Sequence, residues 1–326
     1  MLGGSLRILV VRLGSMGDVV HALPAVASLK NSFPAARLWW LVARRWAPLL
    51  EGNPFVDELV IFERGSPRQL LSLWRRLRAL RFDLAVDLQG LLKSASLGWL
   101  AGATRFYGLD AAEVREWPAA WFYTDRVRTS ARHVVERNLE LAAAAGATRQ
   151  LRVFPLPQGS PEGVLPERAY VLASPLAGWA HKQWPLEYYP ELARLLRQRL
   201  NLPLVVCGPP GSRPVLEALP CVSVLIAGLE GLIYATRRAA AVVGIDSGPL
   251  HLAAALGKPG VAVFGPTDPA RNGPYGGNFT VLRDPRAETT YRRKSGVAPS
   301  MRAVSPEAVY QALVERLQES SGAFPG

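Results

Sequence analysis

The feature that most constrains this chain is an alternation of short apolar runs and longer helical patterns, which occurs twice along the sequence. In the first half the short runs predict strands at 7–11, 38–42, 58–62, 83–88 and 105–108, and the stretches between and after them predict helices at 19–31, 69–80, 91–101 and 131–145. Alternating strands and helices are typical of a parallel sheet wrapped by helices. The first half therefore predicts a doubly wound α/β domain.

The same alternation restarts after a segment rich in proline. Residues 150–168 contain four prolines and two glycines, which predicts a linker. Beyond it we expect strands at 170–174, 202–207, 222–226, 240–245 and 260–264 and helices at 186–200, 229–238, 249–256 and 306–318. A chain of 326 residues also fits two domains better than one.

The predicted organisation is therefore a domain of residues 1–150, a linker of 151–168 and a second domain of 169–326. The C-terminal helix is a candidate to pack back on the first domain. Two such domains predict a central cleft, with ligands at the carboxyl ends of the strands. GT-B glycosyltransferases, periplasmic binding proteins and several nucleotide enzymes share this outline.

The charge balance favours an anionic partner. Lys and Arg total 38 against 26 Asp and Glu, which gives a net charge of +12. Such an excess attracts nucleic acid, anionic lipid head groups or an acidic substrate, although a generally basic surface explains it equally simply. Because the chain has no nucleic-acid reader motif, we do not expect nucleic acid to be the partner.

The cysteines and the N-terminus point to the cytoplasm. Cys207 and Cys221 are too few for a disulfide framework or a metal cluster. The first apolar run, 8–11, is too short for a secretory signal, and no segment approaches the roughly 20 apolar residues of a bilayer span. We expect a cytoplasmic protein. If it binds a membrane, we expect it to do so at the cytoplasmic surface.

The first motif, Gly14-Ser15-Met16-Gly17-Asp18, connects the first strand to the first helix. Its glycines permit a tight turn, but the pattern is not that of a dinucleotide site. Asp18 has two possible roles. It either stabilises the start of the helix or acts as a general base.

The second motif lies where a buried strand of the second half ends, at Asp246, Ser247 and Gly248. The helix that begins there predicts an anion site, because its first N–H groups have no partner within the helix. His251 returns to the same helix face one turn after Ser247, where it is either structural or directed at the anion.

Lys182 lies between two tryptophans in the loop after the first strand of the second half. It is either a surface lysine with its stem on apolar neighbours or a point charge for a diphosphate. The sequence contains no Asp-x-Asp motif and no cluster with metal-ligand spacing. We therefore expect no metal cofactor, with Lys182 and backbone amides neutralising any leaving group.

Residues 66–83 predict an amphipathic helix. Leu70, Leu73, Trp74, Leu77 and Leu80 share one face, whereas Arg68, Arg75 and Arg76 lie on the other. The arginines are either an ordinary solvated face or a surface that meets the membrane or an anionic acceptor.

Together the motifs resemble those of the ADP-heptose:lipopolysaccharide heptosyltransferases, glycosyltransferase family 9. In the first half the resemblance rests on GSMGDVVHALP at 14–24 and DLQGLLKSA at 87–95, and in the second on KQWP at 182–185, DSGPLH at 246–251 and FGPTDP at 264–269. Within the family, VRE at 114–116, WFY at 121–123 and HVVER at 133–137 are most similar to heptosyltransferase I.

The resemblance implies an inverting, metal-independent GT-B enzyme that moves heptose from ADP-heptose to the Kdo sugar of Kdo-lipid A, at the cytoplasmic face of the inner membrane. It implies Asp18 as the catalytic base. The implied donor-site residues are Met16, Gly17, Lys182, Asp246, Ser247, Gly248 and His251. The implied acceptor-site residues are Lys93, Arg115, His133 and Arg137. The alternatives are heptosyltransferase II or another sugar transferase of the family, and a non-catalytic protein that binds nucleotide sugars or polyanions.

The chain departs from the family pattern at the donor site. Where relatives hold the nucleotide ribose with a glutamate, residues 210–213 read PGSR, and the next glutamate is Glu217. Ala177 and Gly178 replace hydroxyl residues that assist the phosphates, which leaves backbone amides to do so.

Overall fold

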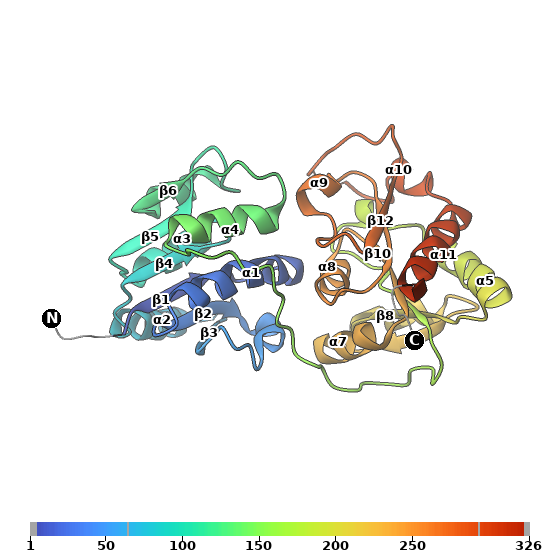
Figure 1. Cartoon of the computed structure of the whole chain (residues 1–326), viewed down its shortest axis with the longest axis horizontal. Helices are drawn as coiled ribbons and strands as arrows, with labels where there is room; N and C mark the ends of the chain where they lie inside the picture. Colours follow the sequence, from blue (N-terminus) through green and yellow to red (C-terminus); the bar gives the residue numbers. More distant parts are fainter. Residues whose placement is uncertain (1–4, 64, 293, 323–326) are drawn as a thin grey trace. The chain divides into compact units, whose positions relative to one another are not determined.

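A computed structural model describes residues 5–63, 65–292 and 294–322 of the chain and divides it into two compact units, residues 1–157 and 158–326 (Figure 1). The division falls within the predicted linker. Each unit is built on a six-stranded, fully parallel sheet. Among the described residues, no helix is long and apolar enough to cross a membrane.

The first unit alternates strands and helices as the apolar runs predict. Its elements are β1 (Arg7–Val11), α1 (Met16–Ser32), β2 (Arg37–Ala43), η1 (Arg44–Leu50), β3 (Glu58–Phe62), α2 (Pro67–Ala79), β4 (Leu84–Asp87), α3 (Leu92–Leu100), β5 (Arg105–Leu109), η2 (Trp117–Phe122), β6 (Asp125–Val127) and α4 (Val134–Ala144). The strand order is β3-β2-β1-β4-β5-β6.

The direction of winding in this sheet reverses between β1 and β4. Because parallel crossovers are right-handed, the reversal places α2, α3 and η2 on the face opposite to α1. These three elements share a core with the strands, to which they contribute Leu77, Ala95 and Ala119. Helices α1 and α4 pack against each other (Figure 1). Both faces of the sheet are therefore covered, which explains why its strands are apolar without alternation.

The second unit repeats this plan. Its elements are β7 (Val171–Ala173), η3 (Ala180–Lys182), α5 (Tyr188–Leu200), β8 (Leu204–Gly208), η4 (Pro210–Ser212), α6 (Arg213–Glu217), β9 (Ser223–Ile226), α7 (Leu229–Arg238), β10 (Ala241–Ile245), α8 (Gly248–Ala255), β11 (Gly260–Phe264), α9 (Pro269–Asn272), β12 (Phe279–Arg283), α10 (Pro299–Arg302) and α11 (Pro306–Gly322). The order β12-β11-β10-β7-β8-β9 reverses between β7 and β10. Helix α11 packs on α5 and β11 of its own unit, and its packing on the first unit stays a prediction.

In each unit the reversal brings two corresponding loops together. The loops after β1 and β4 meet in the first unit, and those after β7 and β10 meet in the second. Such a switch point at the carboxyl ends of parallel strands is where ligands bind in this class of sheet. The motifs with Asp18, Lys182 and Asp246 all lie in or directly after these loops.

Two edge strands, β6 and β12, were not predicted. Strand β6 reads DRV and lacks an apolar run, so only its pairing with β5 reveals it. Strand β12, FTVLR, is half-exposed and lies in a polar stretch. The edge strands β3 and β9 were predicted, because both contain apolar runs that β6 lacks.

The predicted linker is anchored to both units. Its first part is bound to the first unit, where the Leu151 N–H donates to Ser28 Oγ (2.8 Å) and the Asn53 side chain donates to the Pro155 carbonyl (3.2 Å). In its second part the Glu162 carboxylate accepts hydrogen bonds from the N–H groups of Gly228 (2.6 Å) and Gly231 (3.1 Å). Glu162 therefore caps α7, although it is far from this helix in sequence.

This cap yields a prediction about stability. Glu162→Ala leaves two N–H groups at the start of α7 without their acceptor, and a lost helix cap costs about 1 kcal/mol. We expect the free energy of unfolding of the second unit to fall by that amount in urea titrations. The matched control is Glu167→Ala, because Glu167 is an exposed linker residue whose side chain forms no hydrogen bond or ion pair in the described chain. An equal loss in both variants would contradict the cap.

Candidate functional site

The loop between β1 and α1 is shaped by Gly14. Its φ of +144° is one that residues with a side chain rarely adopt, and a Cβ there would lie 2.4 Å from Trp46 Nε1. Ser15 is the N-cap of α1 and forms a capping box with Asp18. Met16 and Gly17 are buried in the first helical turn. Their proposed contact with a donor stays a prediction.

Asp18 is held by three interactions at the start of α1. One carboxylate oxygen, Oδ1, lies 2.6 Å from Arg12 Nη2, and the other, Oδ2, accepts hydrogen bonds from Ser15 N (2.9 Å) and Ser15 Oγ (3.0 Å). Burial raises the pKa of Asp18, but Arg12, the two Ser15 hydrogen bonds and the charge of Arg115 outweigh it and hold that pKa below its ordinary value. Asp18 is therefore a helix cap and also a carboxylate that stays ionised at neutral pH.

A buried carboxylate organises the neighbouring loop after β4. Asp87 accepts hydrogen bonds from Gln89 N, Ser94 Oγ and Tyr123 Oη, each at 2.8 Å. Burial is the largest influence on Asp87 and raises its pKa despite these donors. Gln89 Oε1 in turn accepts from Leu13 N at 2.7 Å, which ties this loop to the one that precedes Asp18. Sequence reasoning gave Asp87 and Gln89 no role, because Tyr123, which donates to Asp87, and Leu13, which donates to Gln89, are distant in sequence.

The four candidate acceptor residues have different surroundings. Arg115 is exposed, and its charge reaches Asp18. Lys93 Nζ lies 4.1 Å from the centre of the Phe62 ring. His133 caps α4 by accepting from Val135 N (3.2 Å). Arg137 is paired with Glu113 (2.9 Å) and is largely buried, which gives it a structural role in its unit. Of the four, Arg115 is the one whose charge helps to lower the pKa of Asp18.

In the second unit Lys182, Asp246 and His251 come together at the switch point. Lys182 Nζ forms an ion pair with Asp246 Oδ2, and His251 Nε2 lies 3.7 Å from Asp246 Oδ1. The lysine also lies over the Trp179 ring, 4.5 Å from its centre. Burial raises the pKa of Asp246, but His251 and Lys182 lower it far more, and the net pKa is well below its ordinary value. Asp246 thus anchors both Lys182 and His251.

The start of α8 offers hydrogen-bond donors next to this cluster. Ser247 is the N-cap, Gly248 begins the helix, and the first N–H groups of a helix are suited to bind an anion. The hydroxyls of Ser247 and Thr267 are buried and have no hydrogen-bond partner in the described parts of the chain. Thr267 lies in the loop after β11 and was not predicted as a site residue. A buried hydroxyl without a partner is costly, which favours a ligand there.

The departure at the ribose position is visible in the structure. Residues 210–213 form a short helical turn, and Glu217 pairs with Arg213 at 2.7 Å. Gly178 has open space around it, and the Ala177 carbonyl accepts from Gln183 Nε2. In the described ranges no three His, Cys, Asp or Glu side chains gather as a metal site would require.

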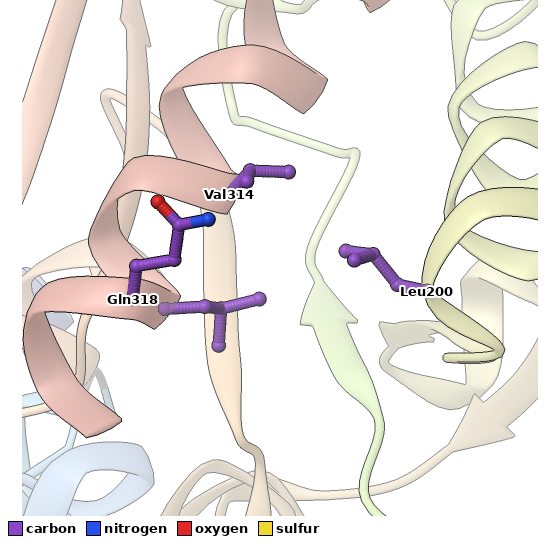
Figure 2. A pocket seen from close by; sticks show the side chains of 4 residues that line it. Leu200, Val314 and Gln318 are labelled. Atoms are coloured by element: carbon purple, nitrogen blue, oxygen red, sulfur yellow. The ribbon is translucent and has the colours of Figure 1, made fainter. Parts of the chain in front are cut away.

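Two hollows lie elsewhere in the second unit. One of about 320 Å³ between α5 and α11 is lined by Leu200, Val314, Leu317 and Gln318 (Figure 2). It contains no ionisable side chain and is unsuited to a phosphate. A larger one of about 510 Å³ follows β11 and β12, and His181, beside Lys182, is among its lining residues.

Two parallel six-stranded domains of this kind are consistent with the GT-B class of glycosyltransferases, and comparison with known proteins gives the family. A model of glycosyltransferase family 9 (heptosyltransferase) matches residues 70–300. Lipopolysaccharide heptosyltransferase 1 of Pseudomonas aeruginosa is 33% identical, over 83% of this chain and 82% of its own length. The Escherichia coli K12 protein of the same name is 30% identical over 86% and 94%. The chain therefore belongs to glycosyltransferase family 9, the heptosyltransferases.

A solved structure agrees with this assignment. E. coli heptosyltransferase WaaC with ADP is 27% identical, has a TM-score of 0.76, and the match covers 95% of this chain and all of that one. The protein is thus a glycosyltransferase of lipopolysaccharide core biosynthesis. It is more similar to these heptosyltransferases 1 than to heptosyltransferase 2 of Salmonella typhimurium, which is 26% identical.

The pairing of Asp18 with Arg12 predicts how stability depends on pH. Because the pKa of Asp18 is depressed in the folded state, its charge stabilises the fold above the unfolded pKa of about 3.9, and this contribution is lost as the pH falls through the folded pKa. Asp18→Asn keeps a cap acceptor but removes the charge from buried Arg12. We expect a loss of about 2 kcal/mol at pH 7 in urea unfolding. The difference in free energy of unfolding between variant and wild type should shrink below about pH 3.9. A difference that stays constant down to about pH 3 would contradict a stabilising charge on Asp18.

Proposed function

We propose that this enzyme transfers L-glycero-D-manno-heptose from ADP-heptose to the Kdo residue of Kdo-lipid A, with inversion at the anomeric carbon and without a metal ion. It would act at the cytoplasmic face of the inner membrane. The similar E. coli protein was solved with ADP and with ADP-2-deoxy-2-fluoro heptose, which supports the donor. The likeness to heptosyltransferases 1 supports the acceptor.

The observation that carries the proposal is the carboxylate of Asp18 at the switch point of the first unit. In the proposed reaction the acceptor hydroxyl attacks the anomeric carbon from the face opposite to the diphosphate, and Asp18 accepts its proton. Because the pKa of Asp18 is below its ordinary value, the carboxylate is fully ionised at neutral pH but is a weak base. Much of the rate must therefore come from positioning and from stabilisation of the leaving group.

The donor diphosphate would bind at the switch point of the second unit. Lys182 supplies a positive charge, the start of α8 supplies N–H groups, and the buried hydroxyls of Ser247 and Thr267 supply donors that lack a partner. These groups would stabilise the charge that develops on the departing ADP. Asp246 and His251 would hold Lys182 in place.

The acceptor is anionic, and the first unit offers cations for it. Arg115 is exposed and its charge reaches Asp18, so it is the first candidate for the Kdo carboxylate. Lys93, His133 and Arg137 would contribute less directly, since the side chains of the last two already have structural partners.

Product analysis tests the function. The purified enzyme is incubated with ADP-heptose and a water-soluble Kdo acceptor without acyl chains, and the product is weighed by mass spectrometry. We expect the mass of one added heptose, and in the NMR spectrum of the product an anomeric configuration opposite to that of the donor. Transfer only to an acceptor that already carries a heptose would instead indicate the activity of a heptosyltransferase 2.

The same assay run with excess EDTA tests the metal-free account. Turnover should be unchanged, because Lys182 and the donors at α8 neutralise the leaving group. Loss of turnover on chelation, with recovery on addition of Mg²⁺ or Mn²⁺, would refute this part.

Asp18→Asn tests the base. Loss of general-base catalysis should lower kcat at least about a hundredfold. Ser15→Ala is the matched control, because it weakens the same helix cap and leaves the carboxylate in place. It should lower the melting temperature but reduce kcat far less. Similar kcat values in the two variants would return Asp18 to a purely structural role.

A further inference from the structure

Large apolar side chains are exposed on three elements of the first unit. Tryptophans dominate the set: Trp99 is 57% exposed, Trp117 59% and Trp121 66%. We call the whole set the aromatic face: Leu70, Leu71 and Trp74 of α2, Leu92 and Trp99 of α3, and Trp117 and Trp121 of η2. The apolar side of α2 is largely exposed, since Leu77 is the only buried residue described in that helix.

The aromatic face is one surface, because its three elements are neighbours. Helix α2 packs on α3, and α3 packs on η2. All three cover the same side of the sheet and share one core. Trp99 contacts Phe122 edge to face (5.9 Å between ring centres), and Trp117 contacts Trp121 in the same way (4.9 Å).

The charge around the aromatic face is positive. Helix α2 contains Arg68, Arg75, Arg76 and Arg78 and no acidic residue. Arg76 is paired with Glu58, whereas Arg68, Arg75 and Arg78 form no ion pair with any residue that the structure describes. The nearby Glu116 carboxylate accepts a hydrogen bond from Leu92 N. Arg68 and Arg75 each lie one helical turn from Leu71, and Arg78 lies one turn from Trp74, so the unpaired arginines border the exposed apolar residues of α2.

This combination matches a membrane surface. Tryptophan is favoured at the level of lipid head groups, where its ring is half-buried and its N–H remains hydrated. A helix that is strongly amphipathic and basic lies in the plane of an anionic interface. We propose that the aromatic face docks on an anionic phospholipid leaflet, with the arginines contacting phosphates and the tryptophans entering the head-group layer.

The position of the aromatic face connects docking to the reaction. The segment that precedes Trp117 is tied to the switch-point loops, because Glu116 N donates to the Gly90 carbonyl (3.1 Å) and Gln89 Oε1 accepts from Leu13 N (2.7 Å). Leu92 N, at the start of α3, donates a hydrogen bond to the carboxylate of Glu116, which directly precedes Trp117. Docking would therefore hold the loop with Asp18 near the head groups, where the sugars of a lipid-linked acceptor lie. This inference rests on the proposed function for the acceptor and adds the surface by which the enzyme reaches it.

Sedimentation with vesicles tests the proposal. The full chain is mixed with vesicles of phosphatidylglycerol and phosphatidylethanolamine, or of phosphatidylcholine alone, at low salt. We expect binding to the anionic vesicles only. Arg68→Gln with Arg75→Gln should weaken it at least tenfold, an effect that added salt removes. The matched control, Arg194→Gln with Arg197→Gln, removes the same charge from exposed positions of α5 and should bind like the wild type.

A second variant tests the aromatic contribution. Trp99→Gln, Trp117→Gln and Trp121→Gln together should weaken vesicle binding at least tenfold while the melting temperature stays close to that of the wild type, because all three side chains are exposed. If both variants bind vesicles as the wild type does, or if the wild type does not bind, the proposal is wrong. A wild-type dimer in solution that the tryptophan variant converts to a monomer would also overturn it, since the face would then be a protein interface.

Turnover separates this proposal from the proposed function. Both variants should turn over the water-soluble Kdo acceptor like the wild type, and should show a raised KM only for Kdo-lipid A presented in anionic vesicles. If the wild type transfers no heptose to either acceptor, the proposed function fails, and vesicle binding still decides the docking surface. An unchanged KM for the vesicle-bound acceptor would refute the link between docking and the reaction.

Discussion

The reversal of winding at the centre of each parallel sheet is the constraint on which the rest of this structure depends. It brings the loop after β1 next to the loop after β4, and the loop after β7 next to the loop after β10. Each pair of loops is joined by a contact between distant residues, Leu13 with Gln89 in the first unit and Lys182 with Asp246 in the second. The charged groups proposed for catalysis lie in or beside these loops because the topology places them there.

Each switch point contains an ion pair, and the two pairs differ in which partner meets solvent. In the first unit the Asp18 side chain is 28% exposed and Arg12 is 6% exposed. In the second unit the cation is the more exposed partner: the Lys182 side chain is 16% exposed and the Asp246 side chain is 7% exposed. A buried partner fixes the position and charge of the group that remains accessible. The first unit therefore presents an anion suited to accept a proton, and the second presents a cation suited to a diphosphate.

The first unit carries a second specialised surface. Helix α2 buries little of its apolar side, and the exposed tryptophans of α3 and η2 extend the same face. A water-exposed apolar surface of this kind usually marks a binding function. In the proposed function its closeness in sequence to Arg115 would place membrane docking and acceptor binding in the first unit, with the diphosphate of the donor bound by the second.

Most of the fold was predictable from the sequence, because fully buried parallel strands are continuous apolar runs. The runs 7–11, 58–62 and 260–264 coincide with β1, β3 and β11, whereas the polar edge strand β6 was not predicted. At the candidate site the motifs identified Asp18, Lys182 and Asp246.

What sequence reasoning missed at the site were the partners of these residues. The pairing of Arg12 with Asp18 and the ties through Asp87 and Gln89 depend on tertiary contacts that have no local pattern. The exposure of the apolar side of α2 could not be predicted for a related reason. Periodicity shows that a helix has an apolar face, but not whether the protein covers it.

The central claim is that the two charged groups have separate tasks, proton transfer for Asp18 and diphosphate binding for Lys182. Calorimetric titration of ADP into Asp18→Asn and Lys182→Ala variants measures this division most directly. The account predicts a wild-type Kd for Asp18→Asn and a Kd raised about tenfold or more for Lys182→Ala, since one charge-assisted contact is worth about 1.5–3 kcal/mol. Equal weakening of ADP binding in both variants, or wild-type binding by Lys182→Ala, would contradict it.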